Sequence, residues 1–69
     1  MQDWDSLKFI LALSRAGTMR AAAETLGTNA ATVSRRIDRL TKQIGRQLFK
    51  KGPDGWLPTP ETRALIRIA

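Results

Sequence analysis

Basic side chains gather in the second half of the sequence, in a pattern suited to binding a polyanion. Between positions 35 and 51 there is one acidic residue, Asp38, and there are seven basic ones: Arg35, Arg36, Arg39, Lys42, Arg46, Lys50 and Lys51. A field of one sign on part of a small domain attracts nucleic acid. A charged face that only contacts solvent is the alternative, and charge alone does not separate the two.

Groups that perform catalysis or hold metals are absent or scattered. The chain has no cysteine and no histidine, which excludes disulfides and the usual thiolate or imidazole metal sites. No serine, threonine or lysine has a visible base partner. Each carboxylate has a capping, turn or surface explanation: Asp3, Asp5, Glu24, Asp38, Asp54 and Glu61. We therefore expect no enzymatic activity and no cofactor in this domain.

Length and hydropathy indicate one small domain outside the membrane. The chain has 69 residues, and a domain of this size buries about 60% of the surface of its unfolded chain. No apolar run approaches the roughly 18 residues that span a bilayer. The first residues are acidic, unlike the basic start of a signal peptide. We expect a cytoplasmic protein with no membrane partner.

Three helices are predicted before residue 46, at Asp3–Ala16, Met19–Leu26 and Ala30–Ile44. A glycine follows each of them and can end it in the left-handed conformation. Thr18 and Asn29 stand where N-caps of the second and third helices are needed. The three consecutive alanines of the second helix, residues 21–23, allow another helix to approach closely.

Apolar stripes indicate which helix faces are buried. In the first helix one stripe holds Trp4, Leu7, Ile10 and Leu11, and a second apolar face holds Phe9 and Leu13. The third helix has a stripe of Val33, Ile37, Leu40 and Ile44. Its opposite face is small, polar and basic, with Ala31, Thr32, Arg35, Arg39 and Lys42.

After Gly45 the pattern favours a short β-hairpin followed by another helix. Residues 48–51 and 56–57 resemble strands, and Gly52-Pro53-Asp54-Gly55 between them is a strong turn signal. Thr59-Pro60-Glu61 then provides a cap, a proline at the first helical position and an acid in the first turn. This last helix is expected to continue past Ala69 in a longer protein.

The second and third helices, joined by Gly27-Thr28-Asn29, form a helix-turn-helix pattern. In such a pair the second helix enters the major groove, and its first residues meet base edges. Small side chains permit close approach, and an arginine can donate in a fork to guanine. The candidate base-reading residues are Ala30, Ala31, Ser34 and Arg35. With the hairpin as a wing, the predicted fold is a mainly α winged helix-turn-helix: a three-helix core, a short β-hairpin and the start of a linker helix.

The candidate phosphate-contacting residues carry hydroxyl, amide or cationic groups around this surface: Thr18, Asn29, Thr32, Arg36, Arg39, Lys50 and Lys51. Thr18 and Asn29 cap helices whether or not they also meet phosphate. Arg36 lies near the apolar stripe and could extend along it. Lys50 and Lys51 could instead be solvated lysines that protect the edge of the hairpin.

The motifs together closely resemble the N-terminal domain of LysR-type bacterial regulators. They are the alanines before Leu26-Gly27, then Thr32-Val33-Ser34-Arg35-Arg36-Ile37, Leu40, Ile44-Gly45, Leu48-Phe49 and Thr59-Pro60. The resemblance covers nearly the whole chain. It implies sequence-specific binding of promoter DNA for transcription regulation, with the recognition helix 30–44 in the major groove and the wing 48–57 on the backbone or minor groove.

The resemblance also implies a division of the chain. Residues 1–58 would be the DNA-binding domain and 59–69 the start of a linker helix for dimerisation. Family members are dimers or tetramers, and a further domain, absent here, binds the small-molecule effector. Many members have glutamine followed by proline or serine where this chain has Ala30 and Ala31, so we expect Arg35 to carry more of the base readout.

The apolar residues of the first and last helices have two possible roles. Phe9, Leu13, Leu65 and Ile68 could form the surface on which two protomers meet, or they could pack within one chain. Trp4 and Trp56 are expected to pack in the interior instead of stacking on bases.

Two rival functions fit the same elements. A winged helix used only for protein–protein contact would not need the basic face of the third helix or the lysines of the wing. The DNA-binding domain of another winged-helix regulator, such as the molybdate-responsive type, would differ in the domain that follows.

Overall fold

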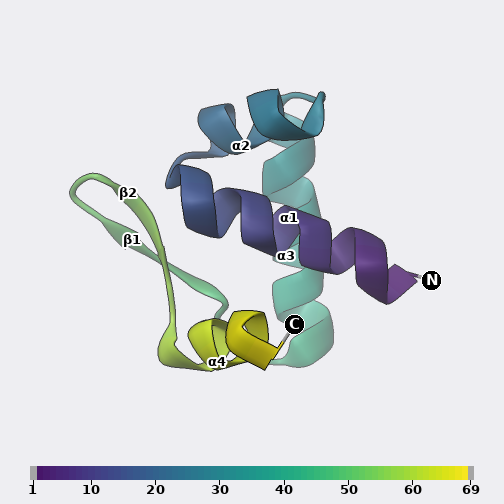
Figure 1. Ribbon diagram of the computed structural model, residues 1–69, viewed down its shortest axis with the longest axis vertical. Coiled ribbons are helices and arrows are strands. Elements are labelled where there is room, and N and C mark those ends of the chain that lie inside the picture. The colour runs from purple at the N-terminus through teal and green to yellow at the C-terminus, as the bar shows by residue number, and fades with distance from the viewer. Residues whose placement is uncertain (1, 69) are drawn as a thin grey trace.

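Four helices and one two-stranded hairpin make up the described part of the chain, residues 2–68, in the computed structural model (Figure 1). The structure describes the backbone of residues 2–68 and the side chains of residues 6–67. The elements, in order, are α1 (Gln2–Ala16), α2 (Met19–Leu26), α3 (Ala30–Ile44), β1 (Phe49–Gly52), β2 (Gly55–Pro58) and α4 (Pro60–Ile68). The bounds of α2 and α3 are as predicted, and α1 begins one residue earlier.

The core lies where α1 crosses α3, and α2 packs on both of them. Ala22 and Ala23 are buried, so the small side chains of α2 permit the close approach that their sequence suggested. The apolar stripe of α3 is buried at Val33, Ile37 and Leu40. The fourth member of that stripe, Ile44, is 48% exposed because it stands in the last turn of the helix.

The face of α1 that meets the core takes one buried residue from each of the two apolar faces of the sequence. Ile10 and Leu13 are buried, whereas Leu7 and Leu11 are only half-buried. Leu13, at 0% exposure, is among the most completely buried side chains of the chain. The side chain of Trp4, which we expected to pack in the interior, lies outside the described residues.

The hairpin has a shorter turn than predicted: β1 begins and ends one residue later than expected, and β2 extends one residue further at each end. β1 and β2 are antiparallel and pair Phe49 with Pro58 through to Gly52 with Gly55. The two glycines therefore belong to the strands, and the turn is Pro53-Asp54 alone. Leu48 precedes β1 and is buried, because it packs in the core instead of extending the strand.

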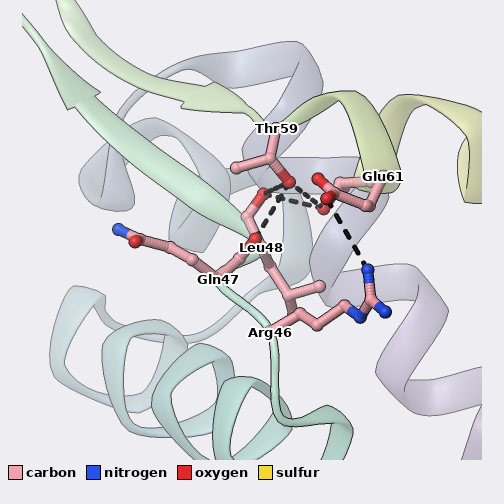
Figure 2. A network of polar contacts seen from close by, with 6 residues as sticks. Arg46, Gln47, Leu48, Thr59 and Glu61 are labelled. Carbon is pink, nitrogen blue, oxygen red and sulfur yellow. Dashed lines mark hydrogen bonds and ion pairs between the residues drawn. The ribbon is translucent and has the colours of Figure 1, made fainter.

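Backbone oxygens before β1 hold the start of α4 (Figure 2). The Leu48 carbonyl accepts hydrogen bonds from the Thr62 hydroxyl at 2.8 Å, the Thr59 hydroxyl at 3.2 Å and the Thr59 N–H at 3.0 Å. The Thr59 hydroxyl also lies 2.9 Å from the Gln47 carbonyl oxygen. Thr62 is only 1% exposed, and its hydrogen bond satisfies the buried hydroxyl. The division of the chain at residue 58 stays a prediction.

Candidate nucleic-acid interface

Capping residues define both ends of α3. The Thr32 N–H donates to the side-chain oxygen of Asn29 at 2.9 Å, and Asn29 itself has an extended backbone. At the other end Gly45 adopts a left-handed φ of 79°, and its N–H donates to the Thr41 carbonyl. Since the buried stripe of α3 faces α1 and α2, the opposite side of the helix is left exposed along its length.

The four candidate base-reading residues lie on two adjoining parts of this surface. Ala31 and Arg35 are exposed on the side of α3 opposite its buried stripe. Ala30 and Ser34 are half-buried, and Ser34 lies on the flank nearer the wing. The side chain that could reach furthest from the helix is that of Arg35, and the small Ala31 lies one turn before it.

Two of the candidate phosphate contacts are confirmed as N-caps. The Ala21 N–H donates to the Thr18 hydroxyl oxygen at 3.1 Å, as the Thr32 N–H does to Asn29. Both caps are exposed. A hydroxyl that accepts one bond keeps its own O–H, and an amide keeps two N–H donors. Capping therefore leaves both side chains with donors for a phosphate at the start of α2 and α3.

Arg36 turns away from the exposed face of α3 and packs on α1. Its guanidinium carbon lies 4.8 Å from the centre of the Phe9 ring, within the range of a cation–π interaction. This is the alternative in which the side chain follows the apolar surface. Arg39 and Arg35 remain exposed, so the cationic part of the α3 surface is carried by those two and by Lys42.

The two lysines of the wing stand on opposite faces of the hairpin. Side chains alternate along a strand, and the register pairs Lys51 with Trp56 and Lys50 with Leu57. The Lys51 Nζ lies 5.0 Å from the centre of the Trp56 ring, and Trp56 packs against the core. Lys50 and Leu57 are exposed on the outer face.

A shallow groove runs between α3 and the wing. Its walls include Ser34, Asp38 and Lys42 from α3, Trp56 from the wing, and Arg46 from the segment that connects them. Lys42 and Arg46 were not among the candidate site residues, although both belong to the basic run of the sequence. Arg46 lies 3.8 Å from Glu61, and such an exposed pair contributes little to stability.

Residues 4–63 match the family described as "Bacterial regulatory helix-turn-helix protein, lysR family". The chain belongs to the LysR family. The resemblance noted in the sequence is thereby confirmed.

Curated LysR-family relatives are much longer than this chain. The Mau operon transcriptional activator of Paracoccus denitrificans is 34% identical over 65 residues, which are 94% of this chain and 23% of that protein. The small neutral protease regulatory protein of Streptomyces coelicolor is 32% identical over 63 residues, 91% of this chain and 20% of that protein. The chain thus spans about a quarter or less of the length of these two relatives.

Solved structures share the fold, and one of them, CbnR, is described as a LysR family transcriptional regulator. The chain superposes on the DNA-binding domain of CbnR in complex with DNA with a TM-score of 0.85 at 26% identity, covering 94% of this chain and 75% of that one. ArgP from Mycobacterium tuberculosis gives a TM-score of 0.82 at 31% identity, covering 93% of this chain and 24% of that one. The prediction of a mainly α winged helix-turn-helix is confirmed.

The surface suggested for contact between LysR-family protomers is smaller than predicted. Leu13 was wrongly included, because a side chain with 0% exposure has no surface left for a partner. Phe9 is half-buried and carries the Arg36 guanidinium. Leu65 is 40% exposed and remains available, whereas the side chain of Ile68 lies outside the described residues.

The described part of this LysR-family chain contains neither a cluster of metal-binding side chains nor a helix that could cross a membrane. Among the side chains of residues 6–67, no three carboxylate, histidine or cysteine groups gather into a metal-binding cluster. Across residues 2–68, every helix is too short or too polar to cross a bilayer. The LysR family is one of regulators and not a class of enzymes.

Proposed function

We propose that this LysR-family domain binds duplex DNA sequence-specifically as the DNA-reading part of a bacterial transcriptional regulator. α3 lies in the major groove, with Ala30, Ala31, Ser34 and Arg35 toward the bases. The wing lies on the backbone or the minor groove. The observation that carries the proposal is the exposed side of α3, small at its start and basic beyond it, on a fold whose solved relatives include complexes with DNA.

The cationic and polar groups around α3 support the proposal. The donors of Thr18, Asn29 and Thr32 lie at the starts of α2 and α3, exposed Arg39 lies further along α3, and Lys51 extends from the wing. Such groups position a helix on the phosphate backbone without reading sequence. Arg36 belongs to this set only if binding releases it from Phe9.

The remaining parts of the proposal concern the longer protein. Because the relatives are several times longer, we propose that this domain acts within a homodimer or tetramer, with Leu65 on α4 in the contact between protomers. A small-molecule effector would bind to a separate C-terminal domain, and no cofactor is needed in this one. The site of action would be the bacterial cytoplasm, at the nucleoid.

A fluorescence-anisotropy titration with mixed-sequence duplex DNA at low and moderate salt tests the proposal. We expect affinity to fall steeply with salt, since each neutralised phosphate adds about 0.9 to the slope of log affinity against log salt. Arg35→Ala should weaken binding. Lys8→Ala, which removes the same charge from the groove between α1 and α2, should leave it nearly unchanged.

Two outcomes would contradict the proposal. Equal losses for Arg35→Ala and Lys8→Ala would show that binding depends on net charge and not on the face of α3. Absence of binding at low salt, both for this chain and for a longer chain that includes the full linker helix, would favour the protein-interaction module instead.

A further inference from the structure

The wing touches the turn between α1 and α2 through backbone atoms. The Trp56 N–H of β2 donates to the Gly17 carbonyl oxygen at 2.6 Å. β2 has β1 on one side only, so this N–H belongs to the free edge of a two-stranded sheet. In Figure 1 the hairpin passes beside the C-terminal end of α1, where this contact is made.

Gly55 makes this close approach possible. Its φ is +135°, a conformation that side chains other than glycine rarely adopt. A Cβ at this position would lie 3.1 Å from the carbonyl carbon of Gly17, and closer still to its oxygen. Since the obstacle is backbone, it cannot rotate away as a flexible side chain can. Any larger residue at 55 must therefore move the wing off the turn.

Gly52, the strand partner of Gly55, has no such requirement. It lacks a positive φ, and a Cβ there would first meet the exposed Leu57 side chain, 3.3 Å away at Cδ1. A small rotation of Leu57 relieves that contact. The two glycines are thus a matched pair within one hairpin, and only Gly55 lies against the turn between α1 and α2.

The contact joins two groups of the proposed phosphate-binding surface. Thr18 follows Gly17 directly and caps α2. On the wing side, Trp56 carries Lys51 over its ring. A Cβ at position 55 would also lie 3.5 Å from Thr18 Cγ2, so the cap itself stands against the wing. The backbone contact therefore sets the distance between the wing cation and the start of α2.

We propose that Gly55 is a positioning residue for DNA binding, because it seats the wing on the α1–α2 turn so that Lys51 and the N-terminus of α2 engage one stretch of phosphates together. This rests on the proposed function. Gly55 does not contact nucleic acid itself. It acts by fixing the position of Lys51. With the wing displaced, Lys51 no longer reaches the phosphate that it meets beside α2.

A double-mutant cycle tests the proposal by measuring what Lys51→Ala costs in different backgrounds. In the wild type, Lys51→Ala should reduce the salt slope by about 0.9, the value of one phosphate. The same reduction is expected in Gly52→Ala. It is also expected in Gly45→Ala, which strains a left-handed glycine where a Cβ meets open space. In the Gly55→Ala background, Lys51→Ala should not reduce the salt slope any further.

An equal effect of Lys51→Ala in the wild-type and Gly55→Ala backgrounds would overturn the proposal. Amide hydrogen exchange of the wild type gives a test that needs no variant. The Trp56 N–H should exchange slowly because it is bonded to Gly17, and exchange as fast as in an exposed loop would also overturn the proposal. Failure of the wild type to bind DNA would instead contradict the proposed function, and the exchange measurement would still decide the contact.

Discussion

The exposed face of α3 and the wing are both assigned to DNA, yet different interactions place them. The α3 face is set by its own sequence: a cap at Asn29, a stop at Gly45 and a buried stripe between them. The turn of the wing has a local signal at residues 52–55, but its place on the domain is set by contacts outside the hairpin, at the Leu48 carbonyl and at Gly17. We infer that α3 should tolerate changes in the wing, whereas the wing should be sensitive to changes elsewhere.

The largest effect is expected from a substitution in the hydrophobic core, which supports both α3 and the wing. Leu13→Ala empties a site at the centre of the core and should lower the free energy of unfolding by about 2–5 kcal/mol. Urea denaturation measures the loss. Leu11→Ala, at a half-buried position of the same helix, is the control and should cost less. Equal losses would mean that Leu13 does not anchor α1 in the core.

A smaller effect is expected from a substitution at the base of the wing, which should leave the structure of α3 unchanged. Thr62→Val removes the hydroxyl that donates to the Leu48 carbonyl, and should cost about 1 kcal/mol. NMR amide shifts should change in the hairpin and in α4 but not in α3. Thr41→Val is the control, because the Thr41 hydroxyl bonds only within α3, to the Ile37 carbonyl at 2.9 Å. Shifts spread evenly over both regions would contradict the comparison.

The parts of the structure that could be predicted are those whose determinants lie close together in the sequence. The bounds of α2 and α3 follow from caps and glycines that lie next to them in the sequence. β1 begins one residue later than predicted because Leu48 looks like a strand residue, although tertiary packing makes it part of the core. No local pattern marks Gly55 as the residue that meets Gly17, since any glycine in a turn looks alike.

Side chains between helices were the other source of error. Leu13 was assigned to an outer surface because a helix with two apolar faces does not reveal which one meets the core. The contact between Arg36 and Phe9 depends on how α1 crosses α3, and periodicity carries no information about crossing. Arg35 and Ala31, in contrast, are exposed as predicted, because one helix and one stripe determine their direction.

The two wing lysines provide a finer test within the hairpin. Lys51 shares a face with Trp56, which lines the groove beside α3, whereas Lys50 lies on the outer face. Lys51→Ala should therefore reduce the salt slope by about 0.9, and Lys50→Ala by less. Anisotropy titrations at several salt concentrations measure both. A larger change for Lys50→Ala would place the DNA on the outer face of the wing.

The smallest expected effect concerns the acid in the groove. Asp38 is exposed on α3 and lines the groove that faces the wing, so its charge should repel a nearby phosphate. Asp38→Asn should tighten binding to mixed-sequence DNA about twofold at low salt, with the gain screened as salt increases. Glu24→Gln, an exposed acid on α2, is the control. The same gain in both variants would show a general charge effect.

The most direct test of the account is a base-substitution profile for a duplex selected by the wild-type domain. Affinities of the wild type, Arg35→Ala and Lys51→Ala would be measured for every single-base change in that duplex. We predict that Arg35→Ala loses about 1–3 kcal/mol and its preference at one position, whereas Lys51→Ala weakens all duplexes by a similar factor. If Arg35→Ala also weakened all duplexes equally and kept the whole profile, the exposed face of α3 would not be reading bases through Arg35, and the central claim would be contradicted.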